Sequence, residues 1–404
     1  QGPAELWHAV HVGDANAIIA LIQRGLCHGL MRDASDHSVL WHSLSFRHLS
    51  LAGLILDRFP PGTEYGVDLG EVHNRRGDTM LHLLCMMQPF TSETAQLFKR
   101  IAQAAPPGTL EHVNASGRSF LDLAAASLNF WVLRFVCVHF PVATKALVCS
   151  ERAPLAGLSQ SFQPPPPPPF APTDRFPEHF GVVRLLGYGA ASSGRVPFAD
   201  VAFDVGPASG GEGEHGRFLA HRVIAGAQSQ VLLQQLESLP VQQLPREGIS
   251  ACIFRVDGRI SREVFRCVLQ FLYTGVVQCG FSSDVCRLTE LLLACMLYQL
   301  PKPLADYTQC ALCPLLPTSP AALVLEVFNL ASERTNTVEL PALKGMAACV
   351  LTRVASIALR ELPPDEVVKT LERVYQAIEQ GIFQAALPPR TGGGAVQRKG
   401  GASR

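Results

Sequence analysis

The sequence has few charges and no excess of either sign. Charged residues make up 17% of the 404 residues, where about 25% is usual, and 34 basic residues balance 34 acidic ones. The chain therefore lacks the overall positive field that attracts phosphates, and nucleic acid is not an expected partner. Because 48% of the residues are hydrophobic, we expect the chain to bury apolar surface in extensive cores or against other proteins.

Long apolar runs are also missing. The densest ones, such as Leu291–Met296, are far shorter than the about 18 residues that a membrane helix needs, so no membrane association is expected. Twelve cysteines are scattered from Cys27 to Cys349, several in apolar helical stretches where a thiol packs as a small hydrophobic group. This pattern favours a reducing compartment, and we expect a cytoplasmic location, with the nucleus as a second one.

A short motif recurs four times in the first third of the chain. It reads LWHA at 6–9, LWHS at 40–43, LHLL at 81–84 and LDLA at 121–124, at spacings of 34, 41 and 40 residues. Each copy opens a short apolar stretch with helical periodicity. The third copy follows Asp78–Met80, giving DTMLHLL, and resembles the ankyrin signature TPLHxA.

This resemblance implies four degenerate ankyrin repeats over residues 4–148. Since the later spacings exceed the usual period of about 33 residues, we expect lengthened loops near 60–72 and 106–113.

Residues 149–175 form a proline-rich linker with six consecutive prolines, Pro164–Pro169. Proline fixes φ and has no amide donor, so the run favours an extended spacer that separates two folded halves. A polyproline-binding protein is an alternative partner for this run, because a preformed extended helix loses little entropy on binding.

Strand and helix patterns are mixed after the linker. Alternating apolar residues predict strands at 200–205, 217–220 and 251–256, and a helical stretch fills 221–239. Ser261 is placed as the N-cap, and Gly275 as the end, of a further helix.

Beyond Asp284 the patterns are wholly helical. The predicted helices are 285–300, 320–334, 343–359 and 365–383. Residues 388–404 are predicted to be a disordered tail. The fold class is therefore mainly α with a small α/β domain.

Three segments of the second half resemble a BTB (POZ) domain. They are FADVAFDV at 198–205, FLAHRVIA at 218–225, and VF with LQFLYTG within 264–275. The later helices, with LEVFNLA at 325–331, resemble the BACK region that often follows BTB. The resemblance implies a BTB domain at 176–300 and a BACK-like helical region at 301–387, and the whole chain resembles the ankyrin–BTB adaptor proteins.

The BTB resemblance implies a homodimer with a charged pocket, formed here by Asp200 and Arg222. We expect these two side chains to pair, because either one alone would be a costly uncompensated charge. His221 is expected to be a packed, hydrogen-bonded core histidine. BTB dimers also use an N-terminal helix, for which 178–186 is the candidate.

The resemblance further implies a face that docks a cullin 3 type ubiquitin ligase scaffold. Its candidate contact residues are Leu236, Leu239, Val241, Leu272 and Tyr273. The segment 239–243 lacks the acidic residue that family members often carry there. We expect an adaptor whose repeats bind a client protein and whose BTB dimer recruits the ligase. The alternative is a dimeric scaffold for trafficking or transcriptional complexes, without ubiquitin transfer.

Motifs for catalysis or cofactors are incomplete. The glycines at 187–189 suggest a kinase loop, but Phe203 replaces the phosphate-binding lysine and Val223 the catalytic aspartate. Cys310 and Cys313 have the spacing of half a zinc site, but no later histidine completes it. No nucleophile, base and orienting group recur at a recognisable spacing. We therefore predict no enzymatic activity, no cofactor and no metal site.

Overall fold

The computed structural model describes residues 3–73, 76–106, 108–150, 155–167, 196, 198–206, 216–244, 248–277, 279–333 and 339–386. Within them the chain is mainly helical, with one small mixed sheet. The expected fold class, mainly α with a small α/β part, is confirmed at this level. Four expectations lie outside the described residues: the end of the proline run, the candidate dimer helix at 178–186, the glycines at 187–189 and the tail at 388–404.

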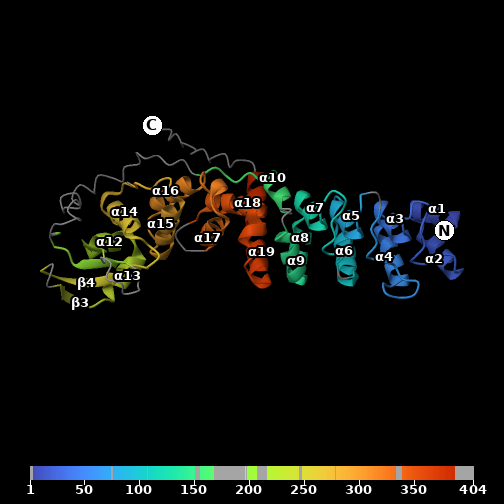
Figure 1. Ribbon diagram of the computed structural model, residues 1–404, viewed down its shortest axis with the longest axis horizontal. Helices are drawn as coiled ribbons and strands as arrows, with labels where there is room; N and C mark the ends of the chain where they lie inside the picture. The colour runs from blue at the N-terminus through green and yellow to red at the C-terminus, as the bar shows by residue number, and fades with distance from the viewer. Residues whose placement is uncertain are drawn as a thin grey trace, which may run out of the picture.

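The first part of the chain is a row of antiparallel helix pairs (Figure 1). The pairs are α1 (Ala4–Val12) with α2 (Ala15–Gln23), α3 (Val39–Ser45) with α4 (Leu49–Arg58), α5 (Met80–Met86) with α6 (Ser92–Ala104), and α7 (Phe120–Ala126) with α8 (Phe130–His139). Helix α9 (Pro141–Val148) follows. As predicted, each copy of the four-residue motif lies in the first helix of a pair.

A bridged hairpin precedes three of these pairs. The isolated bridges join Arg32 to Ser38, His73 to Asp78 and Val113 to Ser119. The helix that follows begins after a hydroxyl residue each time, because Ser38, Thr79 and Ser119 occupy the N-cap position. A hydroxyl there satisfies an amide that the first helical turn leaves without a partner.

The extra residues in the later spacings lie partly elsewhere than predicted. The connection from α4 to α5 is indeed long. The connection from α6 to α7, 105–119, has the same length as 24–38 between α2 and α3, so the lengthened loop expected at 106–113 is wrong. Helix α6 instead has 13 residues, against 9 in α2.

The sheet has the order β2-β1-β4-β3. Its strands are β1 (Val201–Val205), β2 (Gly216–Ala220), β3 (Val241–Leu244) and β4 (Ile249–Arg255), with β1 and β4 parallel and the outer pairs antiparallel. Helices α12 (Arg222–Gln228), α13 (Gln230–Glu237) and α14 (Arg262–Thr274) belong to the same part. Three strands were predicted, and the edge strand β3 was not.

The remaining helices are α15 (Val285–Leu297), α16 (Lys302–Leu312), α17 (Ala321–Ser332), α18 (Pro341–Ala358) and α19 (Pro364–Ala386), with a short 3₁₀ turn at Leu316–Thr318. Among the described helices, α18 is long and apolar enough to cross a membrane, as are α8 and α9 together if their 118° bend is ignored. In α18, 56% of the residues are buried against the rest of the fold, as in the core helix of a folded domain.

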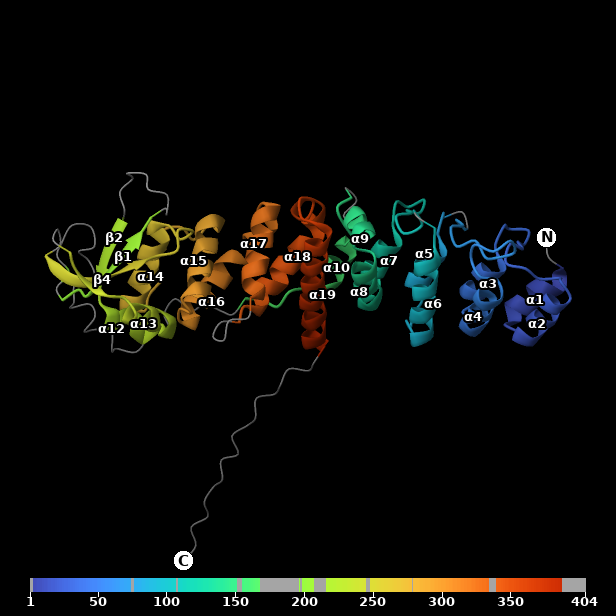
Figure 2. The ribbon, with the colours of Figure 1, turned by 90° about the horizontal axis from the view of Figure 1, so that it is seen from below.

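The elements form one elongated row, in an order that differs from the order of the chain (Figures 1 and 2). The N-terminal helix pairs lie at one end and the sheet at the other. Helices α18 and α19 lie in the middle, where α19 contacts α8 and α9, and the short helix α10 (Ala156–Ser161) contacts α7 and α18. The second half therefore folds back onto the first, and the expected separation of the two halves is not found.

The seam between the halves is apolar with a charged rim. Tyr375 of α19 is fully buried, and its hydroxyl lies 4.0 Å from the Cys137 sulfur of α8. Arg134 of α8 pairs with Glu379 of α19. Burial of a whole tyrosine side chain removes a large apolar area from water, so this seam contributes to the stability of both halves.

The start of the proline-rich segment lies on the same two C-terminal helices. Phe162 is 4% exposed, and its ring faces Gly381 of α19 and Gly345 of α18. Pro164 and Pro165 lie over Gly345. The described part of the predicted spacer is thus packed against the fold.

Candidate functional site

Asp200 and Arg222 form the predicted ion pair at one end of the sheet. Asp200 precedes β1, and Arg222 is the first residue of α12. The Arg222 amide donates to Asp200 Oδ1 over 2.7 Å, and its Nε donates to Oδ2 over 3.1 Å. The Asp200 side chain is 42% exposed and the Arg222 side chain is 35% exposed. The expected pairing is confirmed, and water screens the pair on its open side.

His221 is buried, as predicted, and is held by Tyr273 of α14. The His221 amide donates to the Tyr273 hydroxyl over 2.9 Å, and its Nδ1 lies 2.7 Å from the same oxygen. Burial raises the pKa of Tyr273 to about 12, so the phenol is neutral at physiological pH. The tyrosine therefore joins the end of α14 to the residue before α12.

Three of the five candidate contact residues for the ligase scaffold cannot touch a partner directly. Leu236 is 0% exposed, Leu272 is 1% and Tyr273 is 2%. Their helices α13 and α14 turn these apolar positions into the core, which the helical spacing of their hydrophobic residues requires. That assignment of contact residues is corrected. Leu239 is half-buried, and Val241 is 58% exposed.

Val241 lies on β3, which ends the sheet on one side. Gln242 and Gln243 are exposed beside it, and β3 pairs with β4 alone among the described strands. An edge strand offers unpaired backbone groups to another chain. The edge strand is therefore the accessible part of the predicted contact region.

The helix pairs expose large apolar side chains on several repeats. Their exposed fractions are 59% for Val12, 41% for Phe46, 56% for Tyr65, 41% for Met86 and 40% for Trp131. Phe46 contacts the rings of His11, His42 and His48, and Trp131 stacks on Phe135. Aromatic side chains that are half exposed are typical of protein-binding surfaces.

A group of two histidines and one aspartate lies beside the first bridged hairpin. Within the described residues, Asp33, His37 and His42 are the one set of three metal-ligating side chains, with all ligand atoms within 4.8 Å of one another. His42 Nε2 lies 2.9 Å from Asp33 Oδ2, and His37 Nδ1 lies 3.9 Å from it. The sequence reasoning passed over this group.

The environment favours the metal-binding form of two of these side chains. Burial lowers the pKa of His37. Burial alone would raise the pKa of Asp33, but hydrogen bonds from the His37 amide, the His42 ring and the Ser35 amide hold it below its usual range. A neutral imidazole and an ionised carboxylate are the forms that bind a metal. The spacing 33, 37, 42 is the signal that the sequence offered.

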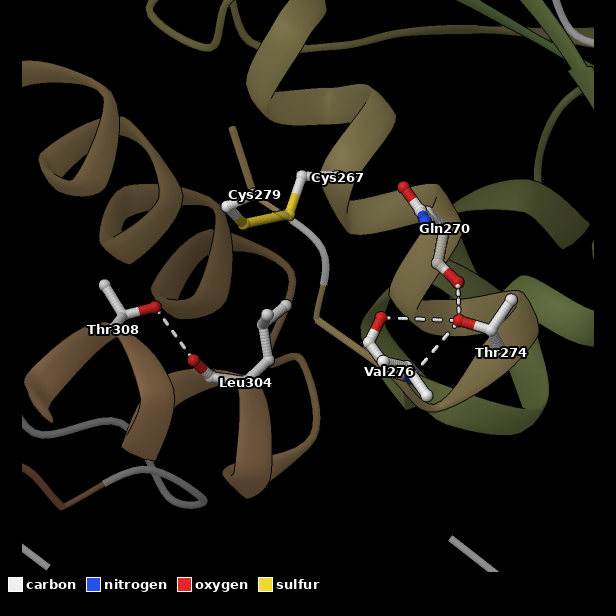
Figure 3. The surroundings of a disulfide bond; sticks show 7 residues. All are labelled: Cys267, Gln270, Thr274, Val276, Cys279, Leu304 and Thr308. Carbon is white, nitrogen blue, oxygen red and sulfur yellow. Dashed lines mark hydrogen bonds between the residues drawn. A yellow bond between two sulfur atoms is a disulfide. The ribbon is translucent and has the colours of Figure 1, made fainter. Parts of the chain in front are cut away.

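Two of the twelve cysteines are paired. A disulfide joins Cys267 of α14 to Cys279 in the loop before α15, with Cα atoms 6.0 Å apart (Figure 3). Beside it, Thr274 Oγ1 donates to the Gln270 carbonyl over 2.7 Å and accepts from the Val276 amide at the end of α14. The sequence predicted thiols throughout.

The other cysteines form no disulfide, and most of them are buried. Burial raises the pKa of Cys137 and of Cys295 to about 12, so these thiols stay protonated near neutrality. Cys310 and Cys313 lie at the end of α16 and belong to no group of three metal ligands among the described residues.

Comparison with known proteins adds no relative. No protein-family model matches the chain, and a search among curated proteins finds no match.

Proposed function

We propose that the chain is a non-enzymatic protein-interaction adaptor of the ankyrin–BTB kind. The observation that carries this proposal is the arrangement of two different surfaces on one body. An open row of helix pairs exposes aromatic side chains at one end. A mixed sheet with an exposed edge strand and the Asp200–Arg222 pair lies at the other.

Three features support the family assignment. The bridged hairpins before capped helix pairs are what ankyrin repeats require. Strands β1 and β2 lie in the segments that resemble BTB, and Asp200 and Arg222 of these segments are paired. The helices from α16 to α19 follow the proposed BTB part, where a BACK region would be expected. The adaptor binds an unidentified client through the repeats and forms a homodimer through the BTB part.

A dimer would present two client surfaces at once. A second binding event on the same assembly is intramolecular, which raises avidity without any new contact. Light scattering of the full chain is expected to give twice the monomer mass. A monomeric mass at micromolar concentration would remove the dimer from the proposal.

The ligase function depends on the edge strand. The full chain is expected to capture a cullin 3 scaffold, and Val241→Arg is expected to weaken capture at least about tenfold, the cost of one well-placed contact. Ile357→Arg is the matched control, because Ile357 is 68% exposed on α18, away from the sheet. No capture by the wild-type chain, beside a BTB adaptor that succeeds, would exclude the ligase.

The alternative function, a scaffold without ubiquitin transfer, has one observation in its favour. The accessible part of the contact region, Val241 to Gln243, carries no acidic residue, and three other candidates there are buried. Depletion of the protein in cells separates the two functions. A client that accumulates indicates a ligase, whereas a client that is mislocalised at constant amount indicates a scaffold.

A further inference from the structure

We propose that Asp33, His37 and His42 form a binding site for one zinc ion. The site lies between the first bridged hairpin and helix α3, and it does not depend on the proposed adaptor function. Imidazole nitrogens and a carboxylate oxygen are common zinc ligands, and three protein ligands leave a fourth position for water or for a side chain of another molecule.

The distances fit this ion. Ligands at the zinc bond lengths of about 2.0–2.2 Å are separated by about 3.3 Å in a tetrahedral site. The separations from Asp33 Oδ2 are 2.9 Å to His42 and 3.9 Å to His37, on either side of that value. The three side chains are between 19% and 23% exposed, so a hydrated ion can reach them from solvent.

The hairpin itself needs only half of the Asp33 carboxylate. Asp33 Oδ1 accepts from the amides of Ser35 and His37, each over 2.8 Å. Asn114 occupies the equivalent place in a later repeat, where its Oδ1 accepts from the amides of Ser116 and Arg118. An asparagine therefore closes the same turn with its single side-chain oxygen. The second oxygen of the Asp33 carboxylate is not needed to form the hairpin.

His42 departs from the pattern of the two later pairs. It stands four residues after the N-cap, where those pairs have Leu83 and Leu123 and the first pair has His8 in its LWHA motif. A leucine thus suits the helix at this position. The His42 ring nitrogen faces the Asp33 carboxylate.

A buried histidine lies next to the group. His73 has a side chain that is 0% exposed, and its ring lies 6.2 Å from that of His37 and stacks on Trp41. Its Nε2 lies 2.9 Å from a carboxylate oxygen of Glu71. His73 therefore packs beside the group and is not one of the proposed ligands.

Zinc titration of the full chain, freed of metal by chelation, tests the proposal. The wild-type chain is expected to bind one zinc ion at this site. Asp33→Asn, His37→Gln and His42→Leu are each expected to lose more than about tenfold in affinity, since even an outer partner of a ligand is worth that much. Asp33→Asn and His42→Leu introduce the residues that later repeats have at the equivalent positions, Asn114 and Leu83, so these variants are expected to fold. Circular dichroism checks the folding of each variant.

Two controls locate the bound ion. His8→Gln changes an exposed histidine outside the group and is expected to bind as the wild type does. In a Cys310→Ser, Cys313→Ser chain, Co²⁺ is expected to give tetrahedral visible bands without sulfur charge-transfer absorption. Equal zinc affinity in the wild type and in the three ligand variants would overturn the proposal, as would a thiolate spectrum for the bound Co²⁺.

Discussion

Two glycines on neighbouring helices face the same aromatic ring at different distances. A Cβ atom added to Gly381 would lie 2.6 Å from Phe162 Cζ, whereas one added to Gly345 would lie 3.5 Å from the same atom. The first distance is a clash and the second is ordinary contact. Because Phe162 is buried, its ring cannot move away without exposing apolar surface.

The substitution Gly381→Ala is therefore expected to destabilise the chain by about 1–2 kcal/mol, the usual cost of overpacking. Gly345→Ala is the matched control, and it should be neutral or stabilising by up to about 1 kcal/mol, because alanine favours a helix more than glycine does. Urea unfolding measures both. If both substitutions stabilise to the same degree, Phe162 does not pack against α19.

His82 carries a pH-dependent part of the stability. It is fully buried, its Nε2 donates to the Arg118 carbonyl over 3.0 Å, and its Nδ1 accepts from the Thr79 amide. Burial lowers the pKa of His82 below 6.5, against the raising effects of the Arg118 carbonyl and Asp78. His112 also lowers it, and Asp122 raises it.

A depressed histidine pKa in the folded state means that the unfolded chain binds the proton first as the pH falls. Stability is therefore present above pH 6.5 and is lost below it, by up to about 1.4 kcal/mol per pH unit until the folded pKa is reached. His82→Gln keeps a side chain suited to the capping box but does not titrate. Thermal unfolding from pH 7.5 to pH 5 is expected to be less pH-dependent in this variant, and identical slopes would contradict the assignment.

At the level of helices and strands, caps and periodicity predicted most elements. Ser38, Thr79 and Ser119 mark three helix starts, and Gly275 ends α14 with a φ of 66°. Helix α16 was not predicted, because Pro303 resembles a helix break, although proline is tolerated in the first helical turn. Strand β3 was missed because three of its four residues are exposed, so it has no apolar alternation to detect.

The candidate sites were predictable to a smaller extent. The Asp200–Arg222 pair followed from the cost of an unpaired charge, which depends only on the two residues. Burial of Leu236, Leu272 and Tyr273 agrees with the helical spacing of the apolar residues around them, so the resemblance, and not the sequence pattern, led to the wrong contact residues. The group at Asp33 joins a hairpin to a helix, and its three side chains come together only when the repeat is folded.

The disulfide between Cys267 and Cys279 fixes the loop that connects α14 and α15. The two residues are 12 apart in sequence, and closing a loop of this length restricts the unfolded chain enough to contribute about 3 kcal/mol. Dithiothreitol is expected to lower the melting temperature of the oxidised wild type. The chain with both cysteines changed to alanine should melt at the lower temperature with or without the reductant. An unchanged wild-type melting temperature would show that the bond contributes nothing.

The seam between α8 and α19 depends on Tyr375. Tyr375→Ala removes a fully buried ring and is expected to destabilise the chain by about 3–5 kcal/mol. Tyr375→Phe is the control with a small effect, because the hydroxyl meets only the Cys137 sulfur at 4.0 Å. Hydrogen exchange should accelerate in both α8 and α19 of the alanine variant. Acceleration confined to α19 would show that the first half does not depend on this contact.

On the scale of the whole molecule, the low charge content has a structural explanation. Helix α19 contacts α8 and α9 of the N-terminal array, and α10 lies between α7 and α18. Part of the proline-rich segment covers α18 and α19. Apolar surface is thereby shared between regions that are distant in the sequence. Such contacts are set by the fold as a whole, and no local pattern predicted them.

The central claim is that the repeat array and the sheet-containing half form one rigid body, which holds two interaction surfaces at a fixed separation. Pulsed electron spin resonance between labels at Ala20→Cys and at Cys286, both exposed positions, tests it most directly, with the half-buried Cys149 and Cys310 changed to serine. The labelled chain is mixed with an excess of unlabelled chain, so that distances within one chain dominate in a homodimer. The account predicts one narrow distance distribution that broadens in the Tyr375→Ala chain. A broad distribution in the chain that retains Tyr375 would contradict it.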